Sequence, residues 1–145
     1  MKRGMPDIFL DTDVAFDILS KREPHYKSSV ILLELAAKGS IRLIISESSL
    51  ANLFYLCFDI YKIKDAALKL SDFVGSCEVA HAGKDSVLLS LHSAFRDKED
   101  ALQYFTALRA ESDYFITRNK RDYKHGIVSL PVYTPDEFLR LNTKF

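Results

Sequence analysis

Five short apolar runs, separated by longer segments in which apolar residues recur at helical spacing, restrict the fold most strongly. The runs cover residues 8–10, 41–46, 77–80, 113–117 and 131–134. Helical spacing covers residues 26–37, 48–61, 64–74, 84–95 and 98–111, and Asp17 lies in a further predicted helix. Strands that alternate with helices indicate a mainly parallel sheet covered on both faces. With 145 residues and no linker or repeat, we expect one α/β domain over residues 1–145.

The net charge does not decide whether the protein binds nucleic acid, but the cysteine content and the apolar runs predict where in the cell it is found. Twenty Lys and Arg residues balance twenty Asp and Glu residues, so net charge neither requires nor excludes a nucleic-acid partner. The two cysteines fit neither a zinc-site spacing nor a disulfide framework. No signal-peptide core precedes Asp11, and no apolar run is long enough for a membrane span. The sequence therefore predicts a cytoplasmic protein with no membrane contact.

Short oxygen-bearing side chains gather where the predicted strands end. Asp11 and Asp13 follow the first strand, and Asn52 lies in the helix after the second. Two more acidic segments, residues 96–103 and 116–123, lie at a helix start and after the fourth strand. In open parallel sheets, ligands bind beyond the carboxyl ends of the strands. We therefore expect four segments to bring oxygen ligands to one rim, where they could hold a divalent cation.

Helix capping is the alternative role for most of these residues. Asp97 and Asn119 are each followed three residues later by an acid, a pattern typical of a capping box. The other capping candidates are Ser46 or Ser48, and Thr12 or Asp13. Capping explains each residue alone, but Asp11 has no evident capping role, and a salt bridge is its alternative. Because all four segments point to one edge of the sheet, the metal site is the preferred interpretation.

Three motifs resemble those of a known family. The stretches "IFLDTDVAFDIL" (8–19), "EDALQYFTAL" (99–108) and "DYFITRNKRDY" (113–123) resemble the first, third and fourth motifs of PIN domains, particularly the bacterial VapC-like branch. The resemblance implies a three-layer α/β/α sandwich and a ribonuclease that depends on Mg²⁺ or Mn²⁺. Many bacterial members are toxins of toxin–antitoxin pairs, so RNA, an antitoxin protein and a second copy in a homodimer are the expected partners.

The resemblance also implies roles for individual residues. Asp11 and Asp100 match the metal ligands, and Asn119 stands where the family usually has an Asp and completes the expected ligand set. Asn52 stands where the family usually has a Glu. The catalytic group expected is Asp11, Asp97 and Asp100, with support from Asp13, Asn52, Glu99 and Asp122. A metal there would shield the phosphodiester charge and help to generate the attacking hydroxide.

A basic segment beside these acids is the expected RNA contact. Arg118, Lys120 and Arg121 can contact phosphate without reading base sequence, although a solvated loop explains them equally well. Because Asn52 and Asn119 carry no charge, an alternative is a catalytically weakened PIN fold that binds RNA or protein. A further alternative, an aspartate phosphatase of the haloacid dehalogenase type, ranks low because its late Gly-Asp motif is missing.

Overall fold

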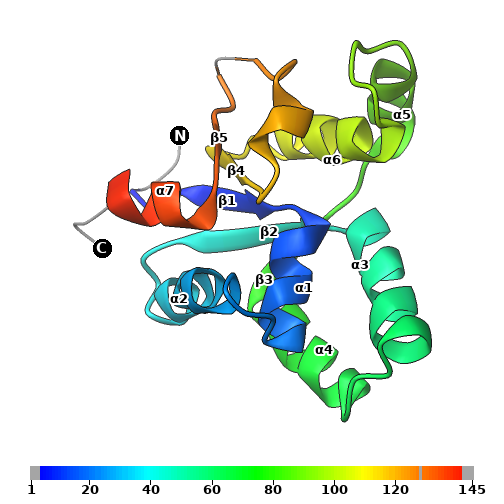
Figure 1. Cartoon of the computed structure of the whole chain (residues 1–145). Helices are drawn as coiled ribbons and strands as arrows, with labels where there is room; N and C mark the ends of the chain where they lie inside the picture. The colour runs from blue at the N-terminus through cyan, green and yellow to red at the C-terminus, as the bar shows by residue number, and fades with distance from the viewer. Residues whose placement is uncertain (1–3, 128, 142–145) are drawn as a thin grey trace.

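A five-stranded parallel sheet forms the centre of the computed structural model, which describes residues 4–127 and 129–141 (Figure 1). The strands are β1 (Asp7–Leu10), β2 (Arg42–Ser46), β3 (Cys77–Ala80), β4 (Tyr114–Ile116) and β5 (Val132–Tyr133), in the order β3-β2-β1-β4-β5. Each neighbouring pair is parallel. All five predicted runs are strands, and the predicted α/β class is confirmed. The order places β4 directly beside β1.

Helices cover both faces of the sheet (Figure 1). One face carries α1 (Thr12–Ser20), α2 (Tyr26–Ala37), α3 (Glu47–Phe54) with its π-helical continuation η1 (Tyr55–Ile60), α4 (Ala66–Gly75) and α7 (Pro135–Leu141). The other carries α5 (Gly83–Leu91), α6 (Lys98–Arg109) and the 3₁₀-helix η2 (Lys120–Tyr123). This arrangement confirms the expected three-layer α/β/α sandwich. No helix in the described ranges is long and apolar enough to cross a membrane.

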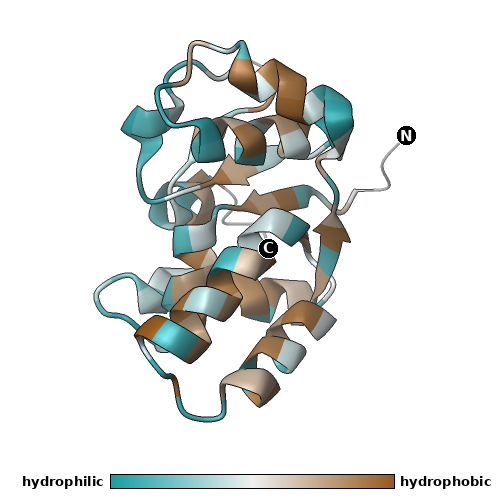
Figure 2. Ribbon diagram, turned by 90° about the vertical axis from the view of Figure 1, so that its right-hand side faces the viewer, coloured by the Kyte–Doolittle hydropathy of each residue, from teal (hydrophilic) through white to brown (hydrophobic). Residues whose placement is uncertain are grey.

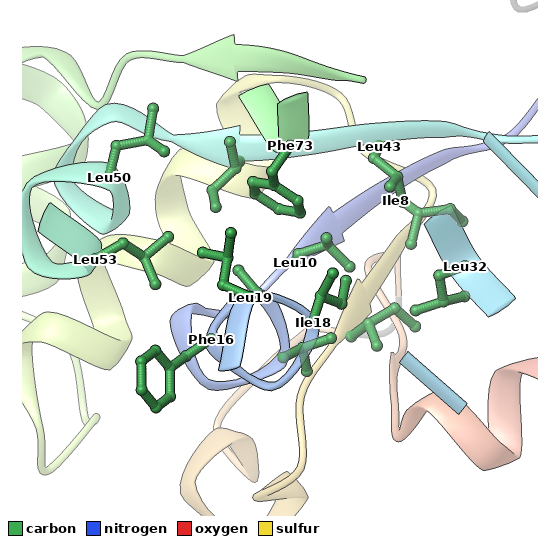
Figure 3. Close-up of a cluster of buried hydrophobic side chains, with 14 of the residues drawn as sticks. Ile8, Leu10, Phe16, Ile18, Leu19, Leu32, Leu43, Leu50, Leu53 and Phe73 are labelled. Atoms are coloured by element: carbon green, nitrogen blue, oxygen red, sulfur yellow. The ribbon is translucent and has the colours of Figure 1, made fainter. Parts of the chain in front are cut away.

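The central strand β1 connects the two hydrophobic cores. Ile8 and Leu10 face the larger core under α1 and α2, and Phe9 faces the smaller core under α6. Figure 3 shows the larger core, where Ile8 and Leu10 lie among side chains from several helices. Because β1 is buried on both faces, it has no polar alternation, as is typical of a central parallel strand. In Figure 2 the central strands are mostly hydrophobic, whereas the helices carry both kinds of residue.

Local signals set several helix ends correctly. The helix over Tyr26–Ala37 has the predicted bounds, and Gly39 follows it with φ +78°. The Gly39 and Ser40 amides donate to the carbonyls of Ala36 and Leu35, the pattern of a Schellman motif. Glycine fits this position because left-handed backbone strains other residues.

Other predicted bounds were wrong. The helix expected over 48–61 begins at Glu47, because Ser46 caps it, and its last turns are π-helical. The helix expected over 84–95 ends at Leu91, because a turn precedes the next capped helix. Helix α7 was not predicted. It has only seven residues, too few to show a clear helical pattern in the sequence. Its buried Phe138 packs into the larger core, which forms only when the chain folds.

Candidate metal centre at the carboxyl edge of the sheet

Asp11 lies between β1 and α1 and is only 7% exposed. Its Oδ1 accepts a hydrogen bond from the Thr12 amide at 2.7 Å, so Asp11 is the N-cap of α1. Its Oδ2 accepts one from Thr117 Oγ1, also at 2.7 Å, just beyond β4. The expectation that Asp11 lacks a capping role, with Thr12 or Asp13 as the cap, was therefore wrong. Within the described ranges Asp11 has no Lys or Arg partner, so the salt-bridge alternative fails.

Asp97 and Asp100 open α6 on the other face of the sheet. Asp97 caps the helix, and its Oδ1 accepts from the amides of Glu99 at 2.8 Å and Asp100 at 3.1 Å. The predicted capping role of Asp97 is confirmed. Asp100 Oδ1 accepts a hydrogen bond from the Tyr123 hydroxyl at 3.2 Å. Asp97 and Asp100 line a cavity of about 410 Å³ together with Arg96 and Asp122.

The carboxyl groups of Asp11 and Asp100 both have raised pKa values, and the charge of Asp11 contributes to the shift of Asp100. Burial raises the pKa of Asp11 to about 6, which the Thr117 hydrogen bond opposes and the charge of Asp13 reinforces. Burial also raises the pKa of Asp100 to about 7, and the charges of Asp11 and Asp97 reinforce it. Among the described residues neither side chain has a cationic partner, so a bound cation would favour the ionised form of both carboxyl groups and lower both pKa values.

Asp11 and Asp100 are two carboxyl groups that can be tested against the ligand preferences of a divalent cation. Among residues 4–127 and 129–141, no group of three or more His, Cys, Asp or Glu side chains is arranged to hold a metal ion. Mg²⁺, however, usually keeps several waters and binds through one or two carboxylates. The pair of Asp11 and Asp100, partly buried and with raised pKa values, fits that mode of binding.

The two asparagines are placed differently. Asn119 lies at the rim, where its Nδ2 donates to Asp13 Oδ2 at 3.3 Å and its backbone amide donates to Thr117 Oγ1 at 3.1 Å. The capping box expected at Asn119 was wrong, because its side chain makes no capping hydrogen bond to η2. Asn52 is exposed on α3, and Glu99 is exposed in the first turn of α6. Thr117 thus contacts both the Asp11 carboxyl group and the backbone amide of Asn119, and the Tyr123 hydroxyl contacts Asp100.

Comparison with known proteins identifies the family. Residues 7–121 match the PIN domain family model. The chain belongs to the PIN domain family. A haloacid dehalogenase phosphatase is thereby excluded.

Full-length relatives of this PIN domain agree with the assignment. This chain is 28% identical over 142 residues to ribonuclease VapC1 of Aquifex aeolicus (strain VF5), and the match covers 94% of this chain and 96% of that protein. Its fold is similar to that of a chain in the crystal structure of VapBC2 from Rickettsia felis, which is bound to a DNA fragment from its promoter. The TM-score is 0.68 and the identity is 21%, and the match covers 88% of this chain and 98% of that one. A chain of a toxin–antitoxin complex from Klebsiella pneumoniae is similar with a TM-score of 0.66 and 20% identity. The match covers 88% of this chain and 97% of that one.

Beneath the rim of this PIN domain lies a polar network that sequence reasoning missed. Gln103 Nε2 donates to Thr12 Oγ1 at 2.8 Å and to the Ser49 hydroxyl, and the two hydroxyls are 2.6 Å apart. Ser46 donates to Gln103 Oε1 at 3.3 Å. The network joins α1, α3 and α6. Helical spacing could have indicated Gln103, which lies one turn after Asp100 on the same face of α6.

The basic side chains of the PIN domain are distributed differently from the expectation. Arg118 Nε lies 2.7 Å from Oδ2 of the buried Asp17, and Lys120 Nζ lies 3.0 Å from Glu137. Arg118 and Lys120 therefore form ion pairs within the fold. Arg121 is exposed. Arg96, which the sequence did not single out, is exposed and lines the acidic cavity.

Proposed function

We propose that this PIN domain is a divalent-metal-dependent endoribonuclease that hydrolyses RNA phosphodiester bonds. The observation that carries the proposal is the pair of Asp11 and Asp100, two partly buried carboxyl groups with raised pKa values and no cationic partner in the described ranges. Perturbed carboxyl groups that meet in this way are characteristic of functional sites. The name of the full-length relative, a ribonuclease, supports the same reaction.

The roles of the acids follow from their positions. Asp11 and Asp100 hold Mg²⁺ or Mn²⁺, and the Asn119 side-chain oxygen is the neutral third ligand. When bound, the ion supplies charge neutralisation for the phosphodiester and lowers the pKa of the attacking water. Asp97 lines the cavity beside Asp100, whereas Glu99 does not, so Asp97 is the better placed of the two to orient that water. Asp13 and Asp122 add negative charge beside the ligands.

The basic residues proposed to contact RNA are those that form no ion pair with an acid in the described part of the chain. Arg96 lines the acidic cavity, so its guanidinium can bind an RNA phosphate next to the reacting group. Arg121 is exposed on η2 and can contact the RNA backbone further along. Arg118 and Lys120 contribute mainly by holding the loop, because they contact Asp17 and Glu137.

We further propose that the protein is the toxin of a toxin–antitoxin pair and forms a homodimer. The similar solved chains come from VapBC and other toxin–antitoxin complexes, which supports an antitoxin partner. An exposed apolar surface supports association. It comprises Phe54, Tyr55, Phe58, Ile60 and Tyr61 of α3 and η1, each about half exposed, and beside it a cavity of about 580 Å³ extends to α4.

RNA cleavage by the purified protein tests the proposed activity. Wild type should cleave single-stranded RNA with Mg²⁺ or Mn²⁺, and EDTA should stop it. Asp11→Asn and Asp100→Asn should abolish cleavage, because each removes a ligand charge. Asp85→Asn, an exposed acid in the first turn of α5, is the matched control and should cut at the wild-type rate. Cleavage that survives EDTA would refute the proposal, and RNA binding without cleavage would favour the weakened binding module.

A further inference from the structure

Tyr123 is a buried tyrosine whose hydroxyl lies at the pair of proposed metal ligands. Its side chain comes from η2 and the residue is only 3% exposed. The hydroxyl donates to Asp100 Oδ1 at 3.2 Å and also interacts with the Asp11 carboxyl group. A phenol has one proton to donate, and in this structure Asp100 receives it, which offsets part of the repulsion between the two acids.

The ring of Tyr123 is held in place by other aromatic rings. Its centroid lies 4.6 Å from that of Phe115, 5.9 Å from that of Phe95 and 6.3 Å from that of Tyr104. Phe115 belongs to β4, and Tyr104 to α6. Close packing against both elements fixes the ring, and therefore the hydroxyl, relative to the strand end and to the helix that carries Asp100.

We propose that Tyr123 is a positioning residue of the metal centre, whose hydroxyl holds the Asp100 carboxylate in the orientation that faces Asp11 and the cation. This inference rests on the proposed function. Hydrogen bonds to ligating carboxylates orient them and are part of what sets metal affinity. Here the hydroxyl engages Oδ1 of Asp100 and leaves Oδ2 for the cation. A phenol keeps its proton throughout the neutral range, so the hydroxyl stays a donor.

Tyr123→Phe removes the hydroxyl and keeps the ring, and Tyr104→Phe is the matched control. Tyr104 is buried in the same aromatic cluster, but its hydroxyl donates to the Leu130 carbonyl at 2.8 Å and accepts from the Ile127 amide at 2.7 Å. Calorimetry should give Tyr123→Phe a Kd for Mn²⁺ about tenfold higher than that of wild type. Tyr104→Phe should bind Mn²⁺ as wild type does. In the RNA assay, Tyr123→Phe should lower kcat and leave KM unchanged, because the hydroxyl does not reach the substrate.

A double variant tests whether the Tyr123 hydroxyl acts through Asp100. Adding Tyr123→Phe to Asp100→Asn should weaken Mn²⁺ binding no further, since the hydroxyl acts through Asp100. Wild-type Mn²⁺ affinity in Tyr123→Phe, or full additivity in the double variant, would overturn the inference and leave the proposed function standing. Failure of the wild-type protein to bind Mn²⁺ and to cleave RNA would overturn both.

Discussion

Replacing Asp11 by Asn should stabilise the metal-free protein at high pH, although it should abolish activity. The folded state holds a proton on Asp11 more tightly than the unfolded state does, because burial raises its pKa from 3.8 to about 6. Ionising this group in the folded protein therefore costs stability. The cost is small below about pH 4, grows as pH rises through the folded pKa, and is complete above about pH 7.

The magnitude follows from the size of the shift. Each pKa unit corresponds to about 1.4 kcal/mol, so the ionised Asp11 costs ~3 kcal/mol above its folded pKa. Asn has one acceptor oxygen, whereas the carboxylate accepts hydrogen bonds from both Thr12 and Thr117. Losing one of these bonds costs ~1 kcal/mol. The metal-free Asn variant should therefore be ~2 kcal/mol more stable than wild type at pH 8 and ~1 kcal/mol less stable at pH 4.

Urea unfolding in EDTA, followed by circular dichroism at pH 4 and pH 8, measures this difference. Asp85→Asn removes the same charge from an exposed position in α5 and should show the same difference from wild type at both pH values. Adding Mn²⁺ at pH 8 should stabilise wild type but not Asp11→Asn, because only a ligand that binds the folded state stabilises it. A stability difference between Asp11→Asn and wild type that does not change with pH would refute the reasoning.

Three further variants test the rim. Arg96→Ala should raise KM for RNA about tenfold and lessen its salt dependence, as for a lost phosphate contact; an unchanged KM would place Arg96 outside the substrate path. Asn52→Glu with Asn119→Asp should tighten Mn²⁺ binding by ~1–2 kcal/mol per added charge in calorimetry. Unchanged affinity there would mean that both side chains lie beyond reach of the cation. Gln103→Ala should cost ~2 kcal/mol in urea unfolding, because it leaves buried hydroxyl groups without their partner; a loss below ~0.5 kcal/mol would show that the hydroxyls satisfy one another.

Features that depend on neighbouring residues could be predicted well from the sequence. The apolar run at Ile8 to Leu10, followed at once by Asp11, identified a buried strand with an acid at its end. The cap at Asp97 and the helix end at Gly39 were also predicted correctly. Each of these signals spans only a few residues, so backbone geometry and local hydrogen bonds set it without help from the rest of the fold.

The contacts that assemble the site could not be predicted in this way. Asp11 meets Thr117 and Asp13 meets Asn119 across 106 residues of chain, and Thr12 meets Gln103 across 91. In the sequence nothing distinguishes Tyr123 from other aromatic residues. Its contact with Asp100 forms only because η2 lies beside α6 in the fold. Family resemblance pointed to the acids, but not to the residues that orient them.

The sequence by itself determined the five strands and most of the helices, because the spacing of the apolar residues differs between the two. It also determined that the sheet is mainly parallel, because the strands alternate with helices. It did not determine the order of the strands. Any order would bury the same apolar runs, but only β4 beside β1 brings Thr117 to Asp11. The tertiary structure also decided that Arg118 faces Asp17 and that Arg96 lines the acidic cavity. The physical reason is that burial and charge at the rim depend on elements distant in sequence, which only the packed sheet brings together.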